Sequence, residues 1–150
     1  QRRSGMAAGR ITLGMGLFVP KPLTPYQWAP QLGIKEAKRR MQIVKRALGG
    51  EGGVRVTSES PRIATLEGLL ARADRRMGKV LEEVRWDPSF GAFKKALARH
   101  GLSFEQENYR TRSSDETLPW GHIQASWPKD RLLKDALRAQ REKTRVVAKP

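Results

Sequence analysis

Two apolar runs with one amphipathic stretch between them constrain the fold of this chain more than any other feature. Residues 10–19 alternate apolar and small side chains and predict a strand, and residues 53–57 predict a second, shorter one. Residues 34–48 place their apolar side chains on one stripe and predict a helix, which a glycine pair ends. Strand, helix and strand in this order predict a βαβ crossover with parallel strands.

The rest of the chain is predicted to be partly helical and partly irregular. Four prolines in residues 20–30 predict an ordered, extended loop, because proline fixes φ and lacks a backbone donor. A second helix is expected to begin at Pro61, with the Ser60 hydroxyl as its cap, and to run to about Val84. Two more helices are expected from Pro88 to Gly101 and over about residues 128–142, with an irregular segment between them. The prediction is an α+β or α/β fragment with two short parallel strands and about four helices.

Apolar periodicity also predicts which helical faces are buried. The expected face of the second helix comprises Ile63, Leu66, Leu70, Ala73, Met77, Val80 and Val84. The third helix is expected to bury Phe90, Phe93 and Leu97, and the last one Leu133, Ala136 and Leu137.

The net charge of +15 narrows the choice of partners. Residues 1–50 hold ten basic residues and a single acid, Glu36. One interpretation is a basic nucleic-acid-binding module. The other, which is preferred, is a segment of a larger protein whose charge is balanced elsewhere, or a protein from an organism whose proteins are generally basic.

Cysteine is absent from the sequence. Disulfides, cysteine nucleophiles, thiolate zinc sites and iron–sulfur ligation are therefore excluded for these 150 residues. No apolar run approaches the ~18 residues of a membrane span, and the N-terminal stretch lacks the apolar core of a signal peptide. A cytoplasmic location is expected. The absence of an initiator methionine is expected either for a piece cut from a longer chain or for a tag remnant.

A charge-dense stretch around Asp74 contains candidates for anion binding. Arg72 and Arg75 lie in it, and guanidinium groups pair well with carboxylate or phosphate. The competing interpretation is a solvated face on which Asp74 makes a local ion pair with a neighbouring arginine. Asp74 is expected to make an ion pair with a neighbouring arginine or to act as a cap.

The polar loop near the C-terminus contains one histidine and a pair of acids that are further site candidates. His122 lies in an aromatic loop and is the better site candidate of the two histidines, although packing is the simpler interpretation. Asp115 and Glu116 are adjacent acids, which are expected either to stay solvated or to pair with Arg110 or Arg112.

Three segments together resemble the radical S-adenosylmethionine enzymes. They are FVPKPLTPYQWAP at 18–30, ARADRRMG at 71–78, and the run from Tyr109 through Asp115 and Glu116 to Leu118, Pro119 and Trp120. The similarity is greatest to the uncharacterised branch that joins a cobalamin-binding domain to the radical barrel. It covers most of residues 10–135. A shared order of motifs implies a fold and a family rather than a substrate.

This resemblance implies a division of the chain and a set of site residues. Residues 1–58 would form the end of the barrel, with its last strands and a crossover helix, and residues 59–150 a helical C-terminal extension. Sites of parallel barrels lie at the C-terminal ends of the strands. By resemblance, the residues beside the adenosine moiety would be Gly16, Leu17, Phe18 and Val19, and those facing the active-site opening Lys21 and Thr24.

The chain departs from the family pattern in lacking the three-cysteine motif. The parent enzyme would hold a 4Fe–4S cluster, S-adenosylmethionine and, in the related branch, cobalamin. The 150 residues alone are expected to bind no metal or cofactor and to be inactive. Their expected partner is the remainder of the parent chain, or a second copy joined through an exposed strand edge.

The rival hypothesis is a small basic module that binds nucleic acid. It predicts that the basic residues gather into one patch, whereas a fragment of a barrel should show bare apolar edges where its neighbours are missing. The basic residues concerned are Arg2, Arg3, Arg10, Lys35, Lys38, Arg39, Lys45 and Arg46.

Overall fold

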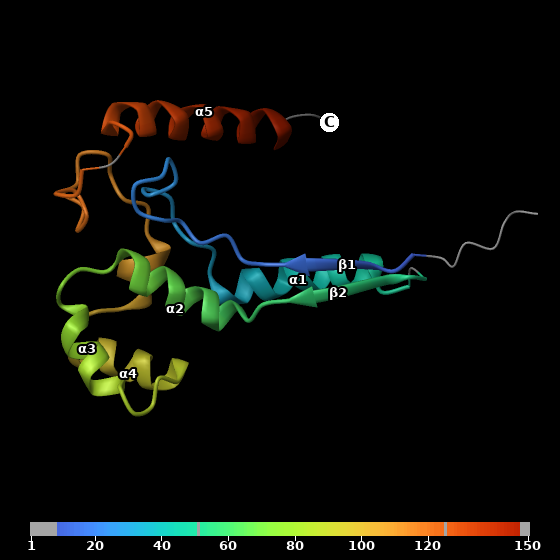
Figure 1. The fold of residues 1–150 in the computed structure, drawn as a ribbon, viewed down its shortest axis with the longest axis horizontal. Helices are drawn as coiled ribbons and strands as arrows, with labels where there is room; N and C mark the ends of the chain where they lie inside the picture. The colour runs from blue at the N-terminus through green and yellow to red at the C-terminus, as the bar shows by residue number, and fades with distance from the viewer. Residues whose placement is uncertain (1–8, 51, 125, 148–150) are drawn as a thin grey trace, which may run out of the picture.

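The computed structural model describes residues 9–50, 52–124 and 126–147 and has a mixed α and β fold dominated by helix (Figure 1). Within these residues there are two strands and six helical segments. In chain order they are β1 (Ile11–Met15), α1 (Ile34–Leu48), β2 (Val54–Ser58), α2 (Pro61–Arg72), α3 (Met77–Val84), α4 (Phe90–Arg99), η1 (Glu105–Tyr109) and α5 (Lys129–Val147). The predicted mixed fold with parallel strands is confirmed.

The strand–helix–strand unit forms as the sequence predicts. β1 and β2 pair in parallel, with Ile11 opposite Val54 and Met15 opposite Ser58, and α1 has the predicted bounds. β1 is shorter than expected, because residues 16–19 lie beyond the strand. The ladder ends there for a physical reason: after Ser58 the chain turns into α2, so β1 has no partner in β2 beyond that point.

The β1–α1–β2 unit projects as an arm from a body made of the other helices, with α1 alongside the strand pair (Figure 1). Among the described residues, the sheet consists of β1 and β2 alone. Ile11 is 64% exposed and Leu13 is also exposed. An outer strand with free backbone groups and bare apolar side chains is an open edge.

The predicted helix from Pro61 to Val84 is wrong in one respect: it is two helices. Ala73 is extended (φ −74°, ψ 159°), and α3 begins only at Met77. The Asp74 carboxylate accepts a hydrogen bond from the backbone N–H of Arg76 at 2.8 Å and pairs with its guanidinium at 2.8 Å. An aspartate side chain that bonds nearby backbone offers an alternative to the helical ladder. The expected ion pair of Asp74 is confirmed, and it lies in the break.

The buried face of α2 also differs from the prediction. Ile63 is 66% exposed and Leu70 is exposed, whereas the buried side includes Ala64, Thr65 and Gly68. The reason lies in the tertiary structure. This side of α2 packs on η1 and on residues 20–31, which we call the proline loop, and these contacts require small and polar residues rather than an apolar stripe. The predicted Ser60 cap is likewise absent, since its side chain makes no capping hydrogen bond.

The main core forms between α3, α4 and the segment that follows. Its buried members are Leu69, Met77, Val80, Val84, Phe93, Ala96, Leu97, Leu102 and Phe104. Phe90 is half-buried and stacks on Phe104 with ring centroids 4.9 Å apart. The α3 and α4 part of the prediction is therefore confirmed.

Two features of the C-terminal third were not predicted correctly. The irregular segment contains η1, a short π-helical turn. The last helix extends to Val147 and buries Leu132, which the periodicity did not single out, while the predicted Leu137 is exposed. Leu132 packs with Trp28, Leu118 and Trp120 in a second, smaller core.

Glu36 is the single acid of α1, and its pKa tests whether it pairs with the neighbouring arginines. Glu36 accepts hydrogen bonds from Arg39 at 2.7 Å and from Arg40 at 2.8 Å, and these bonds lower its pKa from 4.5 to about 2. We expect the Glu36 carboxyl to titrate near pH 2 when followed by carbon NMR. Arg39→Gln should raise this pKa toward its usual value, whereas Lys38→Gln, which removes the same charge without a hydrogen bond, should change it little. An unshifted Glu36 pKa in the unsubstituted chain would contradict its pairing with Arg39 and Arg40.

Candidate functional site

A buried polar junction holds the proline loop, α2 and η1 together, and Arg72 is at its centre. The Arg72 side chain is 0% exposed. Its two terminal nitrogens donate to the carbonyl oxygens of Ala29 and Asn108, both at 2.9 Å. Burial, and next the nearby charge of Arg112, lower the pKa of Arg72 from the usual value of a guanidinium to about 10. One guanidinium thus ties together three segments that are far apart in the sequence.

Two buried amides complete the junction. Gln31 donates from Nε2 to the Ala64 carbonyl at 2.8 Å, and its Oε1 accepts from Asn108 Nδ2 at 2.7 Å. The same Asn108 nitrogen donates to the Thr65 carbonyl at 2.7 Å. Gly68 lies against this pair: a β-carbon there would come within 2.1 Å of the Gln31 amide oxygen. The junction therefore requires glycine at position 68.

A second buried arginine continues the junction toward the C-terminal segment. The Arg112 backbone N–H donates to the Trp28 carbonyl at 2.9 Å, and its Nη2 donates to the Glu107 carbonyl at 2.7 Å. Burial, and next the charge of Arg110, lower the pKa of Arg112. Both buried arginines are used to hold backbone carbonyls.

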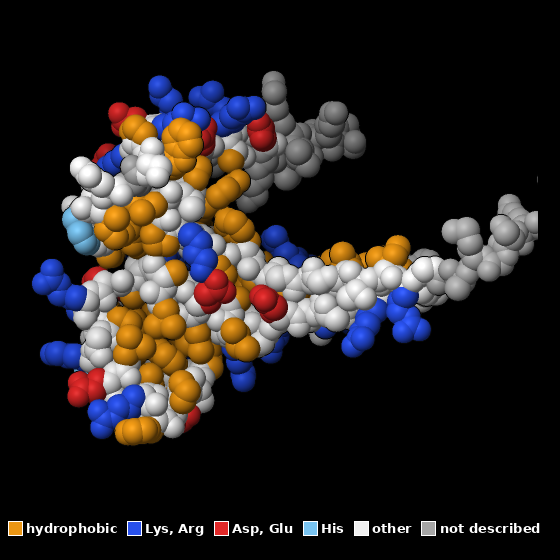
Figure 2. All heavy atoms as spheres, in the orientation of Figure 1, with side chains coloured by type: hydrophobic (Ala, Val, Ile, Leu, Met, Phe, Trp, Pro, Cys, Tyr) orange, Lys and Arg blue, Asp and Glu red, His pale blue; other side chains and the backbone are white. Residues whose placement is uncertain are grey.

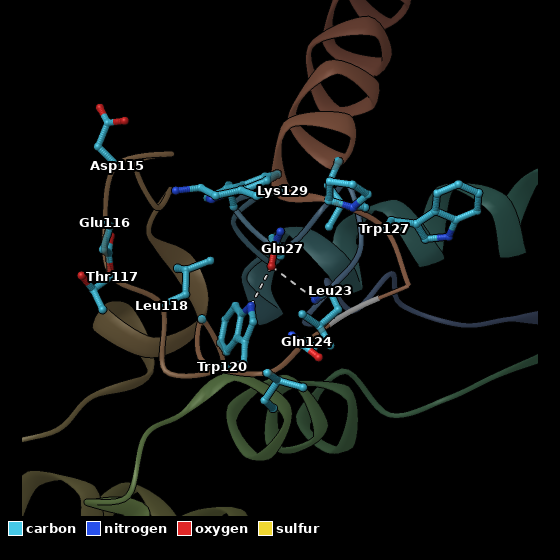
Figure 3. Close-up of a pocket in the computed structure, with 15 residues that line it drawn as sticks. Leu23, Gln27, Asp115, Glu116, Thr117, Leu118, Trp120, Gln124, Trp127 and Lys129 are labelled. Carbon is cyan, nitrogen blue, oxygen red and sulfur yellow. Dashed lines mark hydrogen bonds between the residues drawn. The ribbon is translucent and has the colours of Figure 1, made fainter.

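A hollow of about 560 Å³ opens beside this junction, between the proline loop, the segment around Trp120 and the start of α5 (Figure 3). We call it the indole hollow. Its buried lining includes Gln27, Trp28, Leu118, Trp120 and Leu132. The Gln27 amide oxygen accepts from the Trp120 indole N–H at 2.6 Å and from the Leu23 backbone N–H at 3.2 Å.

A second hollow of about 470 Å³ lies at the C-terminal ends of β1 and β2. We call it the strand-end hollow, and its lining is Gly14, Met15, Gly16, Thr57, Ser58 and Glu59. A β-carbon at Gly16 would lie 3.5 Å from Glu59 Oε2, so the bare glycine keeps this space open. Parallel α/β folds bind their ligands at this end of the strands.

The structure separates the four residues assigned to the S-adenosylmethionine wall. Gly16 lines the strand-end hollow. Phe18 is 58% exposed, packs edge-on against Tyr26 at 5.0 Å between ring centroids, and lines a different groove, toward α5. Leu17 and Val19 are half-buried. These residues do not share one surface, because the chain has left the strand before Leu17.

The remaining predicted site residues are also dispersed. Lys21 forms an ion pair with Glu67 of α2, and the Thr24 hydroxyl donates to the Lys21 carbonyl at 2.8 Å within a turn. Arg75 and His122 are exposed. Arg72, in contrast, is enclosed and occupied by carbonyls, which does not favour the proposed role in anion binding.

Glu116, in the C-terminal loop, pairs with Arg110, whose Nη1 donates to its carboxylate at 2.7 Å. This is one of the two arrangements that the sequence predicted for the acid pair. This bond lowers the pKa of Glu116. Asp115 is exposed.

Sequence reasoning missed the amides Gln27, Gln31 and Asn108. A weak signal was present, since Gln27 and Gln31 flank apolar and proline residues in a loop expected to be ordered. Apart from the Leu23 backbone N–H, which is bonded to Gln27, their partners are 33 to 93 residues away, so no local pattern reveals them.

Comparison of the chain with protein-family models, with curated proteins and with solved structures finds no match to any of them. Within the described part of the chain, no three His, Cys, Asp or Glu side chains are grouped so as to hold a metal ion. In the same residues, none of the helices has the length and apolar character required to cross a bilayer.

Proposed function

We propose that this chain is the C-terminal part of a radical S-adenosylmethionine enzyme, in which it supplies one wall of the cofactor and substrate pocket. The observation that supports this most is the meeting of the three resembling segments. Arg72, from ARADRRMG, bonds to Ala29 of the proline loop and to Asn108, next to Tyr109. Trp120, which ends the third segment, bonds to Gln27 of the proline loop. The three resembling segments therefore pack together into one unit of the structure.

The place of the strand-end hollow also supports the proposal. It lies where parallel barrels carry their sites, and its lining offers the Thr57 and Ser58 hydroxyls and the Glu59 carboxylate beside an open glycine backbone. These groups fit the ribose of an adenosyl ligand, which presents hydroxyl donors and acceptors. Gly16 and Glu59 would hold the adenosyl part of S-adenosylmethionine, which supplies the radical chemistry when it is bound and reduced.

The 4Fe–4S cluster, in contrast, does not fit this chain, because the sequence contains no cysteine to ligate it. In the proposal its ligands belong to the remainder of the parent chain, as does any cobalamin. The open edge of β1 is the surface that neighbouring barrel strands would cover, since Ile11 and Leu13 are exposed there. Self-association of the isolated chain through this edge stays a prediction.

One observation favours the rival, a basic nucleic-acid-binding module. Lys35, Lys38, Arg39, Lys45 and Arg46 are all exposed on α1, and Arg10 is exposed just before β1. In Figure 2 basic side chains line the lower side of the arm while hydrophobic ones emerge on its upper side. Arg2 and Arg3 lie outside the described residues. A polyanion held by this face would dissociate steeply as salt rises, because each neutralised phosphate releases counterions.

The proposed function is tested by extending the expressed gene upstream. We expect the translated upstream region to contain the three-cysteine motif. After anaerobic reconstitution, the extended protein should form deoxyadenosine from S-adenosylmethionine, measured by mass spectrometry, and the 150 residues alone should not. In the extended protein, Gly16→Leu should weaken S-adenosylmethionine binding by about tenfold, a loss of about 1.4 kcal/mol.

Gly33→Leu is the matched control, because a β-carbon at Gly33 meets nothing within 4 Å. It should leave binding unchanged. An upstream region without the motif, or cluster binding by the isolated 150 residues, would refute the proposal.

A further inference from the structure

The amide of Gln27 presents donors to the indole hollow. Its oxygen is identified by its neighbours: the Trp120 indole and the Leu23 backbone both donate to it, so this atom must be the acceptor. The amide nitrogen therefore points away from them, toward the side where Lys129 lies (Figure 3). Gln27 is only 3% exposed, yet no hydrogen bond of this nitrogen to protein is present among the described residues. The Trp28 indole N–H, which also lines the hollow, is buried without a hydrogen-bond partner in the described part of the chain. A buried donor left without an acceptor costs free energy.

The walls of the hollow are suited to a flat ring. The Trp28 and Trp120 side chains are buried, and Leu118 and Leu132 pack with them. Trp127 adds a half-exposed indole at the mouth. A volume of about 560 Å³ lies within the range of small-molecule sites, which are mostly apolar with a few convergent polar groups.

The charges at the mouth of the hollow are mixed, with Lys129 at the start of α5 and Asp115 and Glu116 on the facing loop. Lys129 is the first residue of this helix, in which the backbone N–H groups of Arg131 and Leu132 donate to the Pro128 carbonyl at 3.1 and 3.2 Å. The N–H groups of the first two residues precede these bonds and have no acceptor within the helix. Arg131 stacks on Trp127 with its guanidinium carbon 3.9 Å from the ring centroid. Asp130 lies in the same turn and reduces the positive charge there. On the facing loop, Glu116 pairs with Arg110, and the Asp115 carboxylate points away from the hollow (Figure 3).

We propose that the indole hollow binds a nucleotide. The base lies against the indoles and accepts a hydrogen bond from the Gln27 amide nitrogen, through a ring nitrogen or a carbonyl. The phosphate lies at the start of α5, near Lys129 and Arg131. Stacking on aromatic rings together with hydrogen bonds to base edges is how proteins hold unpaired bases. The nucleotide is either free or one unit of a single strand. This inference is independent of the proposed function.

Tryptophan fluorescence of the 150-residue chain tests the base contact. The probes are the four ribonucleoside 5′-monophosphates, inorganic phosphate, and short single-stranded RNA. Gln27→Glu keeps the acceptor for Trp120 and Leu23 but replaces the donor by a second acceptor. We expect it to weaken nucleotide binding by about tenfold or more, since a lost hydrogen bond is joined by repulsion. Circular dichroism confirms that the variant is folded.

A pair of lysine variants tests the phosphate contact and keeps the test decisive if Gln27→Glu unfolds. Lys129→Gln should weaken binding severalfold, whereas Lys134→Gln, one turn further along α5 and not part of the lining, should not. Binding of monophosphates identifies a free nucleotide, and binding of RNA alone identifies a strand. The proposal is overturned if no probe binds, or if inorganic phosphate binds as tightly as the nucleotides do. It is also overturned if the Gln27→Glu and Lys129→Gln variants both bind nucleotide as tightly as the unsubstituted chain.

Discussion

Replacing Arg72 with alanine is expected to lower the free energy of unfolding by about 2–4 kcal/mol. The carbonyls of Ala29 and Asn108 would lose their donors while staying buried, and the vacated space would leave a cavity. Relief of the cost of burying a charge, visible in the lowered pKa of Arg72, offsets part of this loss. For a chain of this length, the midpoint of thermal unfolding should fall by roughly 5–15 °C.

Two further variants separate the causes. Arg72→Met fills most of the space without donors, so its effect relative to alanine isolates the hydrogen bonds from the cavity. Arg75→Ala is the control: this exposed neighbour has no ion pair among the described residues, and the change should be within about 0.5 kcal/mol of zero. Calorimetry or urea unfolding gives all three values. Equal stabilities of the Arg72 and Arg75 variants would show that the junction does not hold the fold together.

Gly68→Ala is expected to be the most damaging glycine-to-alanine change among the described residues. The new β-carbon would approach the Gln31 amide oxygen to 2.1 Å and the Asn108 amide nitrogen to 2.9 Å. Neither amide is free to move, since each is bonded to α2 backbone as well as to the other. Overpacking costs about 1–3 kcal/mol and a broken buried amide pair adds to it, while the helical preference of alanine returns up to about 1 kcal/mol. We expect a net loss of roughly 2–4 kcal/mol.

The matched control has the opposite sign. Gly78 lies in α3, and a β-carbon there meets nothing within 4 Å. Gly78→Ala should raise stability by about 0.4–1 kcal/mol, because alanine restricts the unfolded chain and favours helix. Amide hydrogen exchange of Asn108 and Gln31 side chains, followed by NMR, should show local loss of protection in Gly68→Ala alone. If both glycine variants are stabilised, the close packing at Gly68 is incorrect.

Local patterns were sufficient for the elements that depend on local interactions. The bounds of α1 follow from its apolar stripe and the glycines behind it, and the parallel pairing of β1 with β2 follows from the crossover between them. An ion pair of Asp74 with a neighbouring arginine was predicted, and its partner is Arg76. The helix break at Asp74 was not predicted, because periodicity alone does not show that the carboxylate competes for helical backbone.

The buried polar side chains were decided by tertiary structure. From its residue type alone, Arg72 would be expected on the surface. Its burial is tolerated because the fold brings the backbone carbonyls of Ala29 and Asn108 within hydrogen-bond distance of its guanidinium. The same holds for Gln27, whose acceptor is used by Trp120, 93 residues further along the chain. The sequence by itself determined α1, because its apolar stripe repeats within a few residues, and the parallel direction of the two strands, because of the crossover between them. Which polar groups point inward, and where the hollows lie, depends on contacts between segments that no short-range pattern encodes.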